Sequence, residues 1–274
     1  MTKYRINKTR FVDQTKTVSF TFDGKKYHGF EGDTLASALL SNGIHLVGRS
    51  FKYHRPRGIM SCGSEEPNAI CQINDNTDLT EPNVRATEIE LYEGLKASSQ
   101  NCWPSLNFDI GGINNLISPF IPAGFYYKTF MWPKSFWKKI YEPLIRLSAG
   151  LGKSPTQPDP DIYDHKHEHC DVLVIGGGIS GIISAKIAAK NNLKTILIED
   201  KNILGGSTIY QNNKNFIIDN QKSNEWLMNE ISELEKLDNL IIKTRTSLAA
   251  FHSYNYLLAK ENISDHLPLD KKNG

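Results

Sequence analysis

A glycine-rich loop near residue 176 carries the clearest chemistry in the sequence. The apolar run 171–175 leads directly into Gly176, Gly178 and Gly181, which match the pattern G-x-G-x-x-G. In such a loop the first glycine permits a tight turn, the second lets a pyrophosphate approach the backbone, and the third allows close packing of helix on sheet. The free N–H groups where the following helix starts, around Ile179 and Ser180, are expected to bind the phosphates. The pattern therefore predicts a dinucleotide site.

Two acids follow the next predicted strand and extend this site. Glu199 and Asp200 end the run 194–198, and Glu199 is expected to accept hydrogen bonds from the ribose hydroxyls. An acid at this point favours an unphosphorylated ribose, so NAD is expected, with FAD as the alternative, rather than NADP. Gly205 and Gly206 come next, as in flavoprotein domains, and are included in the predicted site. The competing interpretation is a glycine turn that binds nothing.

The elements that position this loop read as an α/β unit. We expect strands at 171–175, 194–198 and 240–244, separated by helices at 182–191 and 223–237. Alternating strands and helices indicate a Rossmann-type FAD/NAD-binding domain over residues 170–274. A doubly wound sheet needs further strand and helix units to cover its faces, so this domain is expected to be incomplete.

An α+β unit is expected in residues 1–100, ahead of the dinucleotide domain. Asp23 and Gly24 predict a hairpin turn between strands 18–22 and 25–30. A helix should follow, with Asp33 or Thr34 as its N-cap and Gly43 after its end. Further strands at 68–73 and 85–91 complete a β-grasp, ferredoxin-like prediction.

The cysteines of this unit do not follow the spacing of a ferredoxin. Cys62, Cys71 and Cys102 lack the C-x4-C-x2-C pattern, so we expect reduced, partly buried thiols and no iron–sulfur cluster. The fourth cysteine, Cys170, lies outside the unit, and four irregularly spaced cysteines do not form a disulfide framework.

Residues 101–169 differ in composition from both flanking units. Aromatic residues and prolines crowd the part up to about residue 151, which predicts an arm packed on a neighbouring protein surface. Four lysines among these aromatics, Lys128, Lys134, Lys138 and Lys139, also suggest a membrane-surface stretch, but Pro133 interrupts any long amphipathic helix. A polar segment with several prolines then leads to residue 170, as at a domain boundary.

Two weaker clusters have ordinary explanations. Five basic residues, Arg49, Lys52, His54, Arg55 and Arg57, suggest a phosphate or RNA contact, but a surface loop that meets Glu65, Glu66 or a subunit partner is favoured. His165, His167 and His169 alternate as metal ligands would on an extended chain, although chance histidines in a polar linker explain them as well. No spacing nominates a catalytic nucleophile or any other catalytic residue.

Length and charge set the remaining bounds. A chain of 274 residues favours two domains, and 32 basic against 30 acidic residues give no strong field for nucleic acid or an anionic membrane. The polar start and the absence of a long apolar run predict a cytoplasmic protein that neither spans nor binds a membrane.

Three stretches of the chain closely resemble the alpha subunit family of heteromeric sarcosine oxidase. They are FKYHRPRGIMSCGSEEPNAICQI at 51–73, the segment 81–146, and HCDVLVIGGGISG at 169–181, within a resemblance that covers roughly residues 15–260. The resemblance implies a β-grasp domain that has lost its cluster cysteines, followed by an NAD-associated dinucleotide domain. Gly176, Gly178 and Gly181 match the family motif, and Glu199 occupies the place of its acid.

The resemblance also implies an activity for the complete assembly. The family demethylates sarcosine oxidatively to glycine, produces hydrogen peroxide, and passes the one-carbon unit to tetrahydrofolate. The oxidising FAD belongs to the beta subunit, an FMN lies at the alpha–beta contact, and gamma and delta subunits complete the partners. Family alpha subunits are much longer than this chain, so the chain is expected to be inactive alone, as a truncated or split product. The alternatives are a non-catalytic assembly module, or the N-terminal half of another FAD/NAD-dependent amine or amino-acid dehydrogenase.

Overall fold

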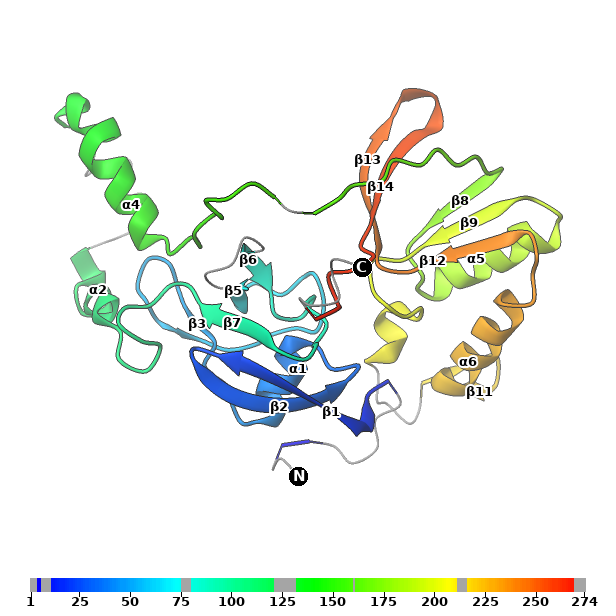
Figure 1. The fold of residues 1–274 in the computed structure, drawn as a ribbon, viewed down its shortest axis with the longest axis horizontal. Coiled ribbons are helices and arrows are strands. Elements are labelled where there is room, and N and C mark those ends of the chain that lie inside the picture. Colours follow the sequence, from blue (N-terminus) through cyan, green and yellow to red (C-terminus); the bar gives the residue numbers. More distant parts are fainter. Residues whose placement is uncertain are drawn as a thin grey trace. The chain divides into compact units, whose positions relative to one another are not determined.

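The protein is described by a computed structural model that covers residues 4–5, 11–74, 80–120, 132–159, 161–210 and 216–268. Its contacts divide the chain into two compact units (Figure 1). The first unit comprises Met1–Ile162 together with His266–Gly274, and the second comprises Tyr163–Asp265. Each unit has its own sheet and is treated separately below.

The first unit is built on a five-stranded mixed sheet with the order β2-β1-β7-β5-β6. Strand β1 pairs in parallel with β7, whereas the other neighbours are antiparallel. The strands are β1 (Asp13–Phe22), β2 (Lys25–Glu31), β5 (Ile70–Ile73), β6 (Glu81–Arg85) and β7 (Leu95–Ser99), and a short ladder joins β3 (Gly48–Arg49) to β4 (Pro56–Arg57).

The predicted hairpin and helix are confirmed. Asp23 and Gly24 both have positive φ, 48° and 74°, as the tight turn between β1 and β2 requires. Helix α1 (Leu35–Ser41) begins after Thr34, whose hydroxyl accepts the Ser37 N–H while the Ser37 hydroxyl accepts the Thr34 N–H. Thr34 rather than Asp33 is therefore the N-cap.

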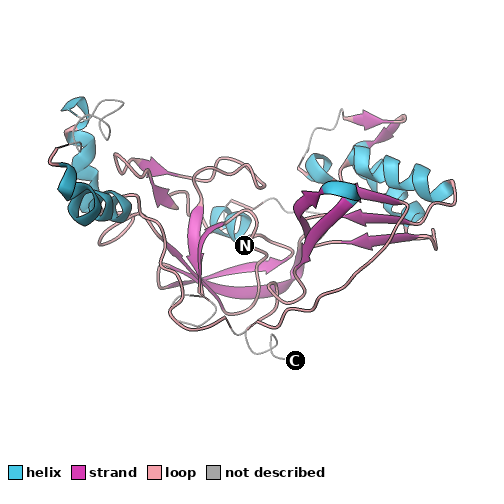
Figure 2. Ribbon diagram, turned by 90° about the horizontal axis from the view of Figure 1, so that it is seen from above, coloured by secondary structure: helices cyan, strands magenta, loops and turns pink. Residues whose placement is uncertain are grey.

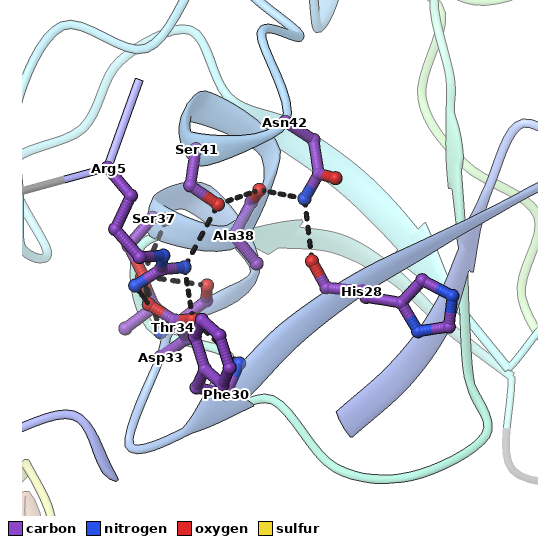
Figure 3. Close-up of polar contacts among 9 residues, drawn as sticks. All are labelled: Arg5, His28, Phe30, Asp33, Thr34, Ser37, Ala38, Ser41 and Asn42. Carbon is purple, nitrogen blue, oxygen red and sulfur yellow. Dashed lines mark hydrogen bonds and ion pairs between the residues drawn. The ribbon is translucent and has the colours of Figure 1, made fainter. Parts of the chain in front are cut away.

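Asp33 instead forms a buried ion pair with Arg5 (Figure 3). Its carboxylate accepts hydrogen bonds from Arg5 Nη1 at 3.1 Å and Nη2 at 2.6 Å, from the Ser37 hydroxyl at 2.7 Å and from the Phe30 N–H at 2.9 Å. The pair fastens residue 5 to the start of α1, because both charged side chains are almost completely shielded from water.

The hydrophobic core of this unit lies between α1 and the sheet. Phe20 and Phe22 alternate inward from β1, and Leu35 and Leu39 face them from α1. The predicted strand at 85–91 is wrong, because β6 ends at Arg85 and the chain forms turns before β7. Ile89 and Leu91 are buried in these turns, so their apolar character reflects core packing and not strand alternation.

Short helical segments follow this sheet. They are η1 (Ile110–Gly112), α2 (Ile113–Leu116), η2 (Ser118–Phe120), η3 (Lys134–Phe136), a π-helical turn η4 (Trp137–Tyr141) and α4 (Glu142–Ser148). Pro133 directly precedes η3, where a residue without an N–H is tolerated. The aromatic residues 121–131 of the predicted arm lie outside the described residues.

The second unit contains a three-stranded parallel sheet with the order β12-β9-β8. Its chain order is β8 (Val172–Ile175), α5 (Ile179–Lys190), β9 (Thr195–Ile198), α6 (Ser223–Leu234) and β12 (Leu240–Lys243), which agrees with the predicted order of elements. The central strand β9 is buried at all four positions, and α5 turns Ile182, Ala185 and Ala189 inward. Figure 2 shows these helices beside the strands.

Other elements of this unit were missed by the sequence reasoning. A hairpin of β13 (Thr246–His252) and β14 (Tyr256–Glu261) follows β12, with η6 (Ser253–Asn255) at its tip. The short segments η5 (Gly206–Ile209), β10 (Ile217–Ile218) and β11 (Gln221–Lys222) lie between β9 and α6. Within the described residues, no helix combines the length and apolar character needed to cross a membrane.

Candidate functional site

The candidate site is built on the turn from β8 into α5. Gly176 has a φ of +94°, a left-handed conformation that favours glycine, and its N–H donates to the Ile198 carbonyl of the neighbouring strand at 2.8 Å. Gly178 is the extended N-cap of α5, and no side chain caps this helix end. The first N–H groups of α5, around Ile179 and Ser180, therefore remain available to an anion together with the positive end of the helix dipole.

The three motif glycines serve different steric needs. A Cβ atom on Gly181 would lie well under 3.0 Å from the Gly176 carbonyl oxygen, so the helix packs directly on the turn only because residue 181 has no side chain. A Cβ atom on Gly178 would meet nothing within 4 Å, so the backbone there borders open space. The loop thus combines a tightly packed side at Gly181 with an open side at Gly178.

A second glycine turn adjoins the first. Gly205 and Gly206 have φ values of +134° and +51°, and the Gly205 N–H donates to the Gly177 carbonyl at 2.8 Å. A Cβ atom on Gly206 would lie 3.0 Å from the Gly178 Cα. The structure thus brings together the two glycine segments that the sequence nominated, about thirty positions apart along the chain.

Glu199 connects the end of β9 to the glycine loop. Its carboxylate accepts hydrogen bonds from the Gly177 N–H and, at 3.1 Å, from the Lys201 N–H. The residue is only 5% exposed, whereas its neighbour Asp200 is exposed. Burial and the adjacent Asp200 raise the pKa of Glu199 to about 7. The two acids therefore lie where the sequence placed them, beside the loop, but in different environments.

Sequence reasoning missed a third side chain at this edge. The Lys201 Nζ donates to the Tyr210 hydroxyl at 2.6 Å and lies 4.6 Å from the centre of the Tyr210 ring. Lys201 directly follows the two acids, so its place beside them could have been predicted from the sequence. Nothing in the spacing indicated that Tyr210 would contact it. The pair sets a positive charge next to Glu199 and Asp200.

The raised pKa of Glu199 predicts a pH-dependent stability. The folded protein favours the neutral acid, so this contribution is complete below the ordinary pKa of about 4.5 and is lost as the pH rises through about 7. We expect the free energy of unfolding of the second unit to fall on the order of 1–3 kcal/mol over that window. Amide hydrogen exchange of peptides from this unit, measured across the window, tests this. The variant Glu199→Gln should flatten the dependence, and an unchanged dependence in that variant would refute the assignment.

The basic cluster at 49–57 anchors a neighbouring segment of the same unit. Arg49 donates to the Leu106 carbonyl, Arg55 Nε donates to Asn115 Oδ1 at 2.7 Å, and His54 Nδ1 lies 2.7 Å from Asp109 Oδ2. The acid that meets this cluster is Asp109, not Glu66 as the sequence suggested, because the Glu66 carboxylate binds four backbone N–H groups.

The histidines of the linker are not gathered into a site. His165, His167 and His169 are all exposed, and in the part of the chain that the structure describes no three His, Cys, Asp or Glu side chains are grouped as metal ligands. The linker is instead fixed by Glu168, which pairs with Lys243 at 3.0 Å.

Two family models match this chain. One, described as a 2Fe-2S iron-sulfur cluster binding domain, matches residues 15–102, and the other, described as FAD dependent oxidoreductase, matches residues 171–256. The second match contains the glycine loop, Glu199 and the second glycine turn.

Individual relatives extend the similarity over nearly the whole chain. The sarcosine oxidase subunit alpha of Rhizobium meliloti (strain 1021) is 48% identical over 97% of this chain and 27% of its own length. That of Corynebacterium sp. (strain U-96) is 27% identical over 93% of this chain and 22% of its own length. The chain thus spans about a quarter of the length of these relatives. The L-proline dehydrogenase of P. horikoshii, with a TM-score of 0.52 and 21% identity over 90% of this chain and 37% of that one, shows similarity of fold alone.

The residues present do not fit the cluster that the first family model implies. A [2Fe–2S] cluster takes four protein ligands, as a rule cysteine thiolates, but residues 15–102 contain only Cys62, Cys71 and Cys102. Burial raises the pKa of the Cys71 thiol to about 12, which disfavours the thiolate that a metal requires. Cys62 is exposed, and Cys102 lies beside the Ser99 hydroxyl at 3.3 Å. The matched region is thus a domain of ferredoxin type that lacks the four cysteine ligands of a [2Fe–2S] cluster.

Proposed function

Because the chain is homologous to the N-terminal portion of sarcosine oxidase alpha subunits over nearly its whole length, we propose that it is the dinucleotide-binding part of such an alpha subunit. The observation that supports this most directly is the open, uncapped start of α5 next to the acid Glu199. A Rossmann-type fold for the second unit is part of the same proposal, and the parallel order β12-β9-β8 with helical crossovers supports it.

The dinucleotide would be held by the two glycine turns and the acids. Its pyrophosphate would bind the N–H groups of Gly178, Ile179 and Ser180, where the open space at Gly178 leaves room for it. Glu199 would turn from the Gly177 N–H to the ribose hydroxyls, with Asp200 exposed beside it. Bound in this way, the dinucleotide would supply hydride transfer.

Two lines of support bear on the identity of the dinucleotide, and they point to different cofactors. The match to an FAD dependent oxidoreductase family supports a flavin dinucleotide, whereas the resemblance to the alpha subunit family implies NAD. Both have an unphosphorylated adenosine ribose, which an acid can bind, whereas the 2′-phosphate of NADP would face Glu199 and Asp200. We propose NAD as the dinucleotide of this site, with FAD as the alternative.

Calorimetric titration of the purified chain tests this proposal. We expect saturable binding of NAD or FAD and at least about tenfold weaker binding of NADP, since one charge repulsion of about 1.4 kcal/mol is worth a factor of ten. The variant Gly178→Ala should bind at least ten times more weakly, because its methyl group would enter the space left for the pyrophosphate. Equal binding by wild type and variant would place the ligand elsewhere.

The reaction of the complete assembly is also a proposal. With a beta subunit that carries the amine-oxidising FAD, and with gamma and delta subunits, the chain would contribute to the oxidative demethylation of sarcosine. FMN would lie at the beta contact, and tetrahydrofolate would accept the one-carbon unit. Sarcosine-dependent peroxide formation that is absent from the chain alone and from the beta subunit alone, and present after mixing, would support this role. Dinucleotide binding without such activity in the assembly would favour a non-catalytic assembly module.

One surface favours a contact with partner subunits. Apolar side chains on η3, η4 and α4 remain exposed, among them Phe136 (43%), Trp137 (46%), Ile140 (39%) and Leu144 (59%). Exposed apolar side chains grouped in this way are typical of a protein interface. The partner is proposed to cover them with an apolar surface.

Substitution of this surface should weaken assembly. The double variant Trp137→Ala/Ile140→Ala is expected to lose at least about 2 kcal/mol of binding energy, roughly thirtyfold in affinity, because buried aromatic anchors dominate interfaces. Co-purification of the co-expressed beta, gamma and delta subunits measures the loss. Ile263→Ala, at a residue that is 69% exposed on the second unit, is the control and should assemble normally. If both variants assemble like the wild type, this surface is not the contact.

A further inference from the structure

The carboxylate of Glu66 is the centre of the loop between β4 and β5. Its Oε2 accepts the N–H groups of Met60 at 2.7 Å and Ser61 at 2.6 Å, and its Oε1 accepts those of Asn68 at 2.8 Å and Ala69 at 3.1 Å. Glu66 is only 1% exposed. Burial alone would raise its pKa, but the four donors outweigh burial and hold the pKa below the ordinary value. The loop is therefore folded around a negative charge.

Glu66 and two of the residues whose N–H groups bind it follow the ligand spacing of an iron–sulfur cluster-binding loop. Ser61, Glu66 and Ala69 are separated by four and then by two residues, which is the C-x4-C-x2-C spacing of plant-type [2Fe–2S] ferredoxins. This loop lies inside residues 15–102, which match a 2Fe-2S cluster binding family. The cysteines of the matched region, Cys62, Cys71 and Cys102, all fall outside this spacing. The loop thus keeps the ligand spacing of a ferredoxin, but residues other than cysteine occupy the ligand positions.

A second segment closes the loop at the place of a fourth ligand. Arg85 Nε donates to the Glu66 carbonyl at 3.1 Å, and the Ala86 N–H donates to the Ala69 carbonyl at 2.8 Å. The Thr87 hydroxyl donates to the Gly63 carbonyl at 2.8 Å, and Thr87 is only 5% exposed. Arg85 is exposed, so Thr87 is the buried residue of this segment whose side chain reaches into the loop.

We propose that residues 60–69 form a cluster-binding loop in which Ser61, Glu66, Ala69 and Thr87 occupy the four ligand positions and the Glu66 carboxylate replaces the cluster as the central anion. A cluster held by four thiolates carries negative charge and accepts hydrogen bonds from surrounding N–H groups. An ionised carboxylate offers about four acceptor sites, enough for the four N–H groups that converge here. The loop thereby keeps its conformation with no metal and with no redox centre. The first unit then serves as a structural support and not as a carrier of electrons.

Restoring the cysteines tests this proposal. The full chain with Ser61→Cys, Glu66→Cys, Ala69→Cys and Thr87→Cys is incubated anaerobically with ferric iron and sulfide. We expect about two iron and two sulfide per chain, the visible absorption of a [2Fe–2S] centre, and an electron paramagnetic resonance signal after reduction. The matched control carries Glu65→Cys in place of Glu66→Cys, so that it has four added cysteines but the wrong spacing, and should bind no cluster.

Two results would overturn the proposal: a folded four-cysteine variant that assembles no cluster, or a control that assembles as much. Should the four-cysteine variant not fold, amide hydrogen exchange of Glu66→Gln decides the question. A glutamine presents an NH2 group to two of the four donors, so exchange at Met60, Ser61, Asn68 and Ala69 should be at least ten times faster. Glu65→Gln, at the exposed neighbouring acid, should leave it unchanged. Wild-type protection in Glu66→Gln would show that the loop does not depend on the charge.

Discussion

Replacing Gly181 by alanine is expected to unfold the start of α5 and to abolish dinucleotide binding. The new Cβ atom would overlap the Gly176 carbonyl oxygen, a backbone atom of the turn that cannot rotate away. Overpacking of this kind typically costs about 1–3 kcal/mol and occasionally more, and a backbone clash belongs to the upper end, so we expect at least about 3 kcal/mol. Chemical denaturation followed by amide exchange in the second unit measures the loss.

Gly178→Ala is the matched control for this substitution. It adds the same methyl group three residues earlier, where φ is −73° and no atom lies within 4 Å. Because alanine is a poorer N-cap than glycine, the free energy of unfolding should fall, but by no more than about 1 kcal/mol. The two variants therefore separate folding from binding: Gly181→Ala loses both, and Gly178→Ala loses binding alone. Equal stability of the two variants would show that the close packing at Gly181 is not needed.

Replacing Asp33 by alanine is expected to destabilise the first unit about as strongly. The change removes the acceptor of two Arg5 hydrogen bonds and leaves the guanidinium of Arg5, whose side chain is 10% exposed, without its carboxylate. Breaking a buried pair by removing one partner typically costs about 3–5 kcal/mol. Thermal or urea unfolding monitored in the first unit measures this loss.

A double-mutant cycle with Arg5→Met identifies the cause. If the isolated charge is responsible, Arg5→Met/Asp33→Ala should be less destabilised than the sum of the single variants. Glu31→Ala serves as the control, because Glu31 pairs with Lys16 at the exposed surface, where ion pairs contribute little. An Asp33→Ala protein as stable as Glu31→Ala would contradict the role given to the buried pair.

Much of the fold could be predicted because certain backbone conformations and close contacts require particular residue types, above all glycine. Asp23–Gly24 and the motif at Gly176, Gly178 and Gly181 specify unusual backbone conformations or close contacts, so they fix the turns around which the strands were placed. The neighbouring Gly205–Gly206 turn lies beside the motif as expected for the same reason, and Glu199 lies there because it directly follows β9, the strand paired with β8. Whether these residues bind a dinucleotide stays a prediction.

The elements that were missed depend on contacts distant in sequence. A strand was predicted at 85–91, but Ile89 and Leu91 fill the core from turns. Strand β7 was missed because its residues LKASS include no strong strand formers. Asp33 and Thr34 were the two predicted N-caps of α1, and Thr34 is the cap. Only the fold brings Arg5 to Asp33. Glu66 looked like one surface acid among several, since nothing in a single sequence shows that four N–H groups converge on it.

The most direct test of the dinucleotide site follows the backbone amides of the whole chain by nuclear magnetic resonance during titration with NAD and with FAD. We expect saturating ligand to shift the amide signals of Gly177, Gly178, Ile179 and Ser180 most strongly. Smaller shifts should occur at Glu199 and Gly206, because the pyrophosphate meets the start of α5. Saturable binding that leaves these signals in place, or no binding of either dinucleotide by the folded chain, would contradict it.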